Sequence, residues 1–258
     1  MTLSVAMITM NEEANLPRTL ESVCFADEIV IVDSFSTDRT LEIARCYNAK
    51  VFVEHFKGHG GQKNSAIDKC TSDWVLLLDA DEVLSKPLQQ SIRMVLSGSP
   101  AHSAYWINRS NNIFGRWIRY GGYYPDRKLR LFRRGAARMT NEASPHSTPF
   151  HDGSVGRLDG DLLHYAYPTL PLYLEHMGRY SNEMARLAVE RGKTSRNPFS
   201  FVWNVVLNPA ATFVYNYVFR LGFLDGREGL LLHLYHSAYV SWKYAKAWEI
   251  SRGHNPRK

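Results

Sequence analysis

Two aspartates at the end of an apolar run are the residues of this chain best suited to chemistry. Asp79 and Asp81 follow the five apolar residues 74–78, which predict a buried strand. Ligands of parallel sheets bind beyond the carboxyl ends of the strands, so both carboxylates are expected at a binding edge. Their hard oxygen atoms suit Mg²⁺ or Mn²⁺, and such an ion suits a diphosphate. Acidic residues also end strands because loops are solvated, and the neighbouring elements must decide between the two interpretations.

Strand and helix signals alternate over the first hundred residues. The apolar runs predict four strands, over 3–9, 28–33, 50–53 and 73–79. Helices are predicted over 16–25, after the capping residues 36–38, and over 62–70. Strands that alternate with helices form right-handed βαβ units on a parallel sheet. The predicted fold class is therefore α/β, with a Rossmann-like nucleotide-binding domain whose central sheet becomes mixed in the segment 104–134.

Four groups of polar residues lie where the predicted strands end or a helix begins. They are Asn11 with Glu12, Asp33 with Ser34, 62–64, and Asp79 with Asp81. One polar strand end carries little information, because caps, turns and solvated charges have the same composition. Four groups that converge on one sheet edge predict a site. The glycine cluster 58–61 fits neither a P-loop nor the dinucleotide fingerprint, which disfavours a kinase or a dehydrogenase.

The composition is that of a folded protein with a basic surface. The 258 residues are 45% hydrophobic and 22% charged, enough for one large domain or a domain with an appendage. The net charge is +6, and six cations fall within 127–138. Such a cluster suits nucleic acid, a membrane surface or a phosphorylated substrate. Nucleic acid is the weakest of these partners, since the sequence shows no RNA-stacking motif and no helix-turn-helix signature.

Several segments resemble the family 2 inverting glycosyltransferases with the GT-A fold. They are 5–13, 30–34 with Asp38, 62–64, and 78–82. Later segments resemble the lipopolysaccharide core β-1,4-glucosyltransferase branch, namely 122–126, 130–134, 160–165 and 222–226. The resemblance implies a GT-A catalytic domain over 1–168 and a C-terminal helical region over 169–258 for membrane, acceptor or dimer contacts.

The resemblance also implies a reaction. A hexose, with glucose expected, moves with inversion from a UDP-sugar to a hydroxyl of a lipopolysaccharide core or related glycolipid acceptor. Transfer to a polyprenyl phosphate or a capsular glycan is an alternative, and a non-catalytic nucleotide-sugar-binding protein is another. A sugar nucleotidyltransferase should carry a glycine-rich loop after the first strand, and this chain has none there.

The same resemblance assigns roles to residues at the sheet edge. Mg²⁺ or Mn²⁺ is the implied cofactor, and its implied ligands are Asp81, Asp79 and His164. The implied contacts of the nucleotide sugar are Thr9, Asn11, Glu12, Asp33, Ser34, Lys63, Asp79, Arg130 and Arg133. The arginines suit an anion because a guanidinium can offer two donors to a phosphate. His164 is alternatively a hydrogen-bonded core histidine.

The general base is the point at which the chain departs from the branch. The branch carries Val-His-Glu in the loop before its Gly-Arg-Leu strand, whereas this chain has Pro145-His146-Ser147. Inversion needs a carboxylate base, and a serine has no useful basicity. Glu142 and Asp126 are the two main candidates, and Asp152 is a further carboxylate in the same loop. Weak or absent catalysis is the remaining explanation.

The C-terminal region is predicted to be helical, over 172–192 and 230–250. The segment 201–219 has no charge and the length of a membrane span, but its asparagines and Pro209 predict a core or interfacial helix pair broken at Pro209. Aromatic and basic helices can lie on an anionic membrane, so the inner membrane surface is an expected partner. The N-terminus predicts a strand and no signal peptide, which indicates a cytoplasmic protein.

Overall fold

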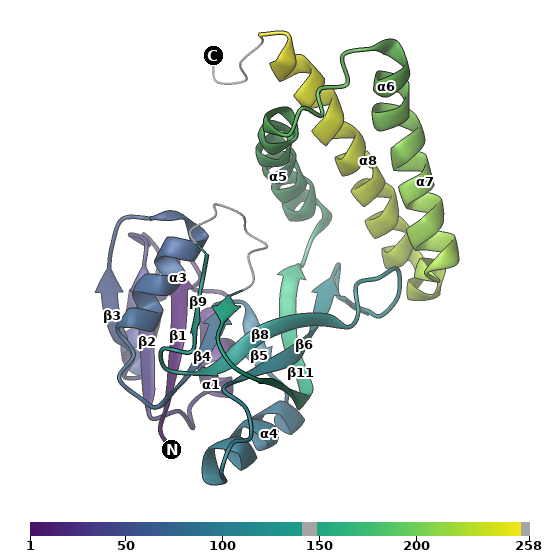
Figure 1. Ribbon diagram of the computed structural model, residues 1–258. Helices are drawn as coiled ribbons and strands as arrows, with labels where there is room; N and C mark the ends of the chain where they lie inside the picture. The colour runs from purple at the N-terminus through teal and green to yellow at the C-terminus, as the bar shows by residue number, and fades with distance from the viewer. Residues whose placement is uncertain (141–148, 254–258) are drawn as a thin grey trace. The chain divides into compact units, whose positions relative to one another are not determined.

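The structure, a computed structural model, describes residues 1–140 and 149–253 (Figure 1). The chain forms two compact units. The sheet unit consists of Met1–Ser110 and Asp126–His164, and the helical unit consists of Asn111–Pro125 and Tyr165–Lys258. The sequence predicts a boundary after residue 168 and does not assign residues 111–125 to the helices.

One mixed sheet holds most of the described strands. Their order is β3-β2-β1-β4-β8-β6-β11-β5, and β7 pairs with β6. The bounds are β1 Leu3–Thr9, β2 Glu28–Asp33, β3 Lys50–Val53, β4 Trp74–Asp79, β5 Glu82–Leu84, β6 Ala104–Ile113, β7 Arg116–Ile118, β8 Asp126–Arg133 and β11 Val155–Tyr167. Two short strands, β9 Ala137–Arg138 and β10 Phe150–His151, pair with each other. The helices of the sheet unit are α1 Leu16–Ser22, α2 Thr40–Cys46, α3 Gly58–Asp68 and α4 Lys86–Ser97.

The predicted α/β fold with a mixed sheet is confirmed. Strands β1 to β4 pair in parallel, and β8 pairs antiparallel with β4. Strands β1, β2 and β4 read as apolar runs because both of their faces are covered, and every residue of β2 is buried. The edge strand β3 is mostly exposed. Helix α3 begins at Gly58 and not at Gln62 as predicted, so the glycine cluster lies inside the helix. The Gln62 side chain explains the earlier start, because its Oε1 accepts the N–H of Lys57 at 3.2 Å.

The link between β4 and β5 requires the sheet to curl. Only Ala80 and Asp81 separate the two strands in the chain, yet β8, β6 and β11 lie between them in the sheet order. Four strand spacings in a flat sheet cover about 19 Å, whereas the three Cα steps from Asp79 to Glu82 cover at most about 11 Å. Curling brings the start of β5 back to the end of β4. The segment 79–82 therefore lies where two distant strands of the sheet meet.

Helices cover both faces of the sheet, and each face has its own apolar core. On one face α1, α2 and α4 contribute Leu16, Leu20, Ala44, Leu88 and Ile92. On the other face α3 contributes Ala66 and Ile67, which pack with Val75 and Phe132 of the sheet. The helices thus fix the strands, and the strands present their polar ends at the edge.

The helical unit is built from two long helices and a third, composite one (Figure 1). The long helices are α5 Leu170–Glu190 and α8 Gly226–Ser251. The composite helix consists of α6 Pro198–Val202, a π-helical turn Trp203–Leu207, α7 Asn208–Val214 and a second π-helical turn Tyr215–Phe219. A short 3₁₀ turn, Gly222–Asp225, leads into α8. The core of this unit includes Tyr173, Met177 and Leu232.

The predicted break at Pro209 is wrong, because the helix continues through it. Proline lacks an N–H and its ring crowds the preceding turn. The π-helical turn widens the helix ahead of the proline, since Asn208 N–H bonds to the carbonyl of Trp203, five residues earlier. The carbonyl of Val205, which faces the missing donor, accepts instead from the hydroxyl of Ser241 on α8 at 2.8 Å. Within residues 1–140 and 149–253, no helix combines the length and apolar character that crossing a membrane requires.

Candidate active site

Asp79 ends β4 between two cations. Lys63 on α3 places Nζ 2.6 Å from Oδ1 of Asp79, and Arg130 on β8 places Nη2 2.7 Å from Oδ2. Burial alone would raise the pKa of Asp79, but Arg130 and Lys63 hold that pKa well below its usual range. The carboxylate is therefore charged at neutral pH, and it fixes both cations at the edge of the sheet.

The alternation of charges continues along the same edge. Glu82 on β5 is fully buried, and its Oε1 lies 2.7 Å from Arg130 Nη2 and 3.3 Å from Arg109 Nη1. Arg109 on β6 also donates to Asp126 at 2.8 Å, and Lys128 lies 3.1 Å from the Asp126 carboxylate. Burial opposes ionisation of Asp126, yet Arg109 and Lys128 lower its pKa. We call these paired residues the edge network: Lys63, Asp79, Glu82, Arg109, Asp126, Lys128 and Arg130.

Asp81 and His164 form a pair of their own. Asp81 lies in the link between β4 and β5, and His164 lies on β11, opposite Glu82 in the strand register. Nε2 of His164 is 3.2 Å from Oδ2 of Asp81, and both side chains are partly exposed. The structure thus brings together two of the three predicted metal ligands. The oxygens of the third, Asp79, face Lys63 and Arg130.

The polar residues after β1 and β2 hold their loops together. Asp33 is fully buried, and its carboxylate accepts from the hydroxyl of Thr9 at 2.8 Å and from the N–H of Ser36 at 2.8 Å. Gln62 on α3 donates to the hydroxyl of Ser34 at 3.2 Å. The side chains of three predicted nucleotide contacts, Thr9, Asp33 and Ser34, are therefore hydrogen-bonded within the protein, where they hold the loops of the sheet edge in place.

Asn11 and Glu12 connect the first loop to the second. Asn11 has φ of 57°, and its side-chain oxygen accepts the N–H of Thr37 at 2.8 Å. The N–H of Glu12 donates to the hydroxyl of Thr40 at 2.8 Å. Burial raises the pKa of Glu12, and Asp81 is among the carboxylates that raise it further, while Asn15 opposes them.

A family model described as glycosyl transferase family 2 matches residues 4–151, which is more than half of the chain. The chain belongs to glycosyl transferase family 2. It is accordingly a glycosyltransferase, as the resemblance implied. A relative in Rhizobium meliloti (strain 1021), the lipopolysaccharide core biosynthesis glycosyltransferase LpsC, is 30% identical over 96% of this chain and 92% of its own length. An uncharacterized glycosyltransferase of Rickettsia typhi is 33% identical over 76% of this chain and 70% of its own.

The fold of this family 2 chain also matches a solved structure. The mannosyltransferase PcManGT from Pyrobaculum calidifontis, in complex with GDP-Man and Mn²⁺, superimposes with a TM-score of 0.54. The match covers 95% of this chain and 86% of that protein at 14% identity. Identity this low supports the GT-A fold and nothing finer.

Not every residue predicted for the glycosyltransferase site lies with the others. Arg133 pairs in register with Trp74, the first residue of β4, and its guanidinium stacks over the Trp74 ring. Asp79 is the last residue of β4, so Arg133 lies at the opposite end of the strand from Arg130 and Asp79. Glu142, one of the two candidate bases, lies outside the described residues. The other, Asp126, lies inside the edge network.

The donor set tests whether a divalent cation fits this glycosyltransferase. Over residues 1–140 and 149–253, no three His, Cys, Asp or Glu side chains gather as a ready metal cage. Asp81 and His164 offer one carboxylate and one imidazole. Mg²⁺ is commonly held by one or two carboxylates together with substrate phosphates. The residues present therefore fit a cation that is completed by a diphosphate, in a site smaller than the one predicted.

Sequence reasoning gave no role to Glu82, Arg109 or Lys128 in the family 2 site. A signal was available for Lys128, because Asp126, Lys128 and Arg130 alternate and so share one face of β8. Arg109 had no such signal, since its partners come from β5 and β8 and only the strand register brings them together.

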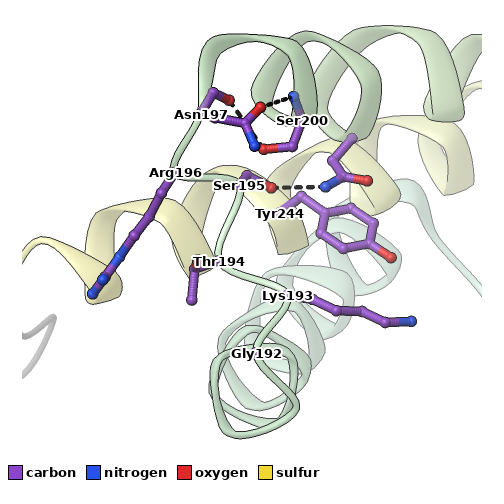
Figure 2. A pocket seen from close by; sticks show the side chains of 9 residues that line it. Gly192, Lys193, Thr194, Ser195, Arg196, Asn197, Ser200 and Tyr244 are labelled. Carbon is purple, nitrogen blue, oxygen red and sulfur yellow. Dashed lines mark hydrogen bonds between the residues drawn. The ribbon is translucent and has the colours of Figure 1, made fainter.

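A cavity of about 460 Å³ lies in the helical unit, around the connection from α5 to α6 (Figure 2). It is lined by polar and basic residues, including Lys193, Arg196 and Tyr244. Inside it the Ser195 hydroxyl accepts from Asn204 at 2.9 Å, and the Asn197 side chain accepts the N–H of Ser200 at 2.7 Å. None of the predicted site residues lines this cavity.

Proposed function

We propose that this glycosyltransferase moves a hexose, with glucose as the first candidate, from a UDP-sugar to a hydroxyl of a lipopolysaccharide core or related glycolipid, with inversion. The observation that carries the proposal is the Asp81–His164 pair, at 3.2 Å, beside the two cations that Asp79 holds. A carboxylate–imidazole pair next to a lysine and an arginine suits a diphosphate with its cation. The name of the Rhizobium meliloti relative supports the lipopolysaccharide core as the acceptor class.

Each group at the edge has a task in this proposal. Lys63 and Arg130 receive the diphosphate, because Asp79 already holds both where they can exchange partners. The loops after β1 and β2 receive the uracil and ribose, with Asn11 and Glu12 at their surface and Thr9, Asp33 and Ser34 beneath. Asp81 and His164 would hold Mg²⁺ or Mn²⁺, which when bound neutralises charge on the departing UDP. A glycolipid acceptor places this work at the inner face of the cytoplasmic membrane.

The charge of Asp126 bears on the identity of the base. A general base works best with a pKa near the working pH. Arg109 and Lys128 lower the pKa of Asp126 and occupy its oxygens, so this carboxylate is a poor proton acceptor. We propose that Asp126 positions Arg109 and that Glu142, ahead of Asp152, is the base. Glu142→Gln should then reduce turnover at least about a thousand-fold, with the KM for the donor retained. Asp126→Asn should instead change donor KM and stability. A loss of kcat in Asp126→Asn alone would assign the base to Asp126.

A donor panel tests the proposed function. The full chain is incubated with Mn²⁺ and, in turn, UDP-glucose, UDP-galactose, UDP-N-acetylglucosamine and GDP-mannose, and the released nucleoside diphosphate is measured. We expect slow hydrolysis of one UDP-sugar, and faster release when lipopolysaccharide with a truncated core is added. Discrimination among these sugars depends on a few contacts, so one donor should clearly exceed the rest. Release from GDP-mannose alone would overturn the UDP assignment. Binding without release from any donor would favour a non-catalytic protein.

A further inference from the structure

The composite helix 198–219, which we call the outer helix, exposes its apolar side chains to solvent. The chain carries no charged residue from Asn197 to Phe219. Five pairs of exposed residues follow one another along the outer helix, and all ten are aliphatic or aromatic. They are Val202, Trp203, Val206, Leu207, Ala210, Ala211, Val214, Tyr215, Val218 and Phe219. We call this surface the apolar face.

The polar residues of the outer helix face the protein. Asn204, Asn208, Thr212 and Asn216 recur every four residues and are all partly buried. Asn204 donates to Ser195, and α8 runs alongside, with Ser237 and Ser241 donating to the carbonyls of Pro209 and Val205 (Figure 1). A helix on the surface of a water-soluble domain shows the reverse arrangement, with its apolar stripe inward. The outer helix is therefore inverted relative to an ordinary surface helix.

The two π-helical turns keep the apolar face straight. The exposed pairs recur every four residues, whereas an α-helix has 3.6 residues per turn. Each four-residue step would turn the face by about 40°, so the fifth pair would lie almost opposite the first. A π-helical turn holds more residues, and the two turns at 203–207 and 215–219 offset this rotation. The backbone is thus adjusted to hold ten exposed apolar residues on one side.

Basic residues flank both ends of the apolar face. Arg191, Lys193 and Arg196 precede the outer helix, and Arg220 and Arg227 follow it, all exposed. The one acidic residue between 191 and 227, Asp225, is buried and accepts the N–H groups of Arg119 and Tyr120. Every exposed charge within 191–227 is therefore positive, although the exposed Glu190 directly precedes this stretch. A second copy of the same face would bring like charges together, whereas anionic lipid headgroups complement them.

We propose that the apolar face of the outer helix binds an anionic lipid bilayer and lies in the plane of the membrane. The aliphatic and aromatic side chains enter the boundary between headgroups and acyl chains, and the cations at both ends bind lipid phosphates. The proposal deepens the proposed work at a membrane surface by naming the surface that docks, and it does not depend on which donor the enzyme uses.

Vesicle flotation of the full chain tests the proposal. Vesicles of phosphatidylglycerol and phosphatidylethanolamine are compared with vesicles of phosphatidylcholine, and Val206→Glu/Val214→Glu is compared with the unchanged chain. We expect strong binding to the anionic vesicles and several-fold weaker binding to phosphatidylcholine or at high salt. The double variant should bind about a hundred-fold more weakly, because two charges replace two inserted side chains. Met94→Glu/Leu172→Glu, at exposed apolar residues off the face, is the matched control and should bind normally.

Two further measurements keep the outcome decisive. Quenching of tryptophan fluorescence by brominated lipid should fall in Trp203→Phe, since Trp203 lies on the face. Donor hydrolysis without acceptor should proceed at the same rate in the Val206→Glu/Val214→Glu variant as in the unchanged chain. If the unchanged chain itself hydrolysed no donor, the proposed function would be contradicted and the membrane proposal would not. Flotation of that variant like the unchanged chain would overturn the proposal. So would a lipid-free dimer, seen by sedimentation, that the same substitutions dissociate.

Discussion

The edge network of the sheet unit and the outer helix of the helical unit depart from the usual separation of polar and apolar residues in opposite ways. Glu82 and Arg130 are almost completely buried charges, and each lies against a charge of opposite sign. Phe199 and Phe219 are 79% and 73% exposed, while Asn208 is partly buried. Buried charges need partners inside the protein, whereas exposed apolar groups gain from a partner outside it. The first departure indicates a small charged ligand, and the second indicates a surface.

Removing the carboxylate of Asp81 should have the largest effect on the sheet unit. In the proposed site Asp81 and His164 hold the cation, so Asp81→Ala should lower turnover at least about a thousand-fold and abolish calorimetric binding of Mn²⁺ in the presence of UDP. The melting temperature should change little, because the Asp81 side chain is partly exposed. Asp159→Ala, at an exposed aspartate of β11, is the control. Full turnover in Asp81→Ala would remove the cation from this position.

Neutralising Glu82 should show that the edge network is also structural. Glu82→Gln leaves Arg130 and Arg109 buried without their shared carboxylate, and breaking a buried pair typically costs about 3–5 kcal/mol. Urea denaturation should report this loss of the free energy of unfolding. Glu42→Gln removes a glutamate from an exposed pair with Arg39 and should leave that free energy unchanged within error. Equal losses of the free energy of unfolding in Glu82→Gln and Glu42→Gln would show that burial of the Glu82 charge does not determine its contribution to stability.

The part of the fold that the sequence predicts is the part that local patterns determine. Strands β1 to β4 are apolar runs bounded by polar residues, so their positions follow from the sequence within a residue. The strand β5 has three residues and no periodicity, and its position at the far edge of the sheet depends on pairing with β11. The Arg109–Glu82 contact follows from that pairing, which explains why it could not be predicted.

The outer helix shows the same limit. Its apolar residues predict a helix, and Pro209 correctly signals a missing hydrogen bond. The sequence around Pro209 does not show that the hydroxyl of Ser241, from another helix, serves the carbonyl of Val205. A single proline predicts a helix break only when no donor from another element reaches the carbonyl that faces the proline.

Acidification should weaken the helical unit through His236. Burial, reinforced by repulsion from His233 and Lys243, lowers the pKa of His236 from 6.5 to about 4. Between these values the unfolded chain binds a proton that the folded chain excludes, so stability is present above pH 6.5 and is lost as the pH falls toward 4. The loss is on the order of 3 kcal/mol. Urea denaturation at both ends of this pH range should show that the free energy of unfolding falls less in His236→Phe than in the unchanged chain. His55→Phe, at an exposed histidine, is the control, and its free energy of unfolding should fall as much as that of the unchanged chain.

The smallest expected effect concerns the carbonyl beside Pro209. Ser241→Ala removes a hydroxyl donor to the carbonyl of Val205, which should cost about 1–2 kcal/mol of the free energy of unfolding. Ser251 bonds the carbonyl of Trp248 within its own helix, so Ser251→Ala is the matched control and should cost less. If the helix through Pro209 depends on this hydroxyl, Ser241→Ala should also speed amide exchange in residues 203–207, where the π-helical turn would open. Unchanged amide exchange in residues 203–207, with an unchanged free energy of unfolding, would show that the π-helical turn accommodates Pro209 without the Ser241 hydroxyl. The backbone of the outer helix alone would then keep the apolar face straight.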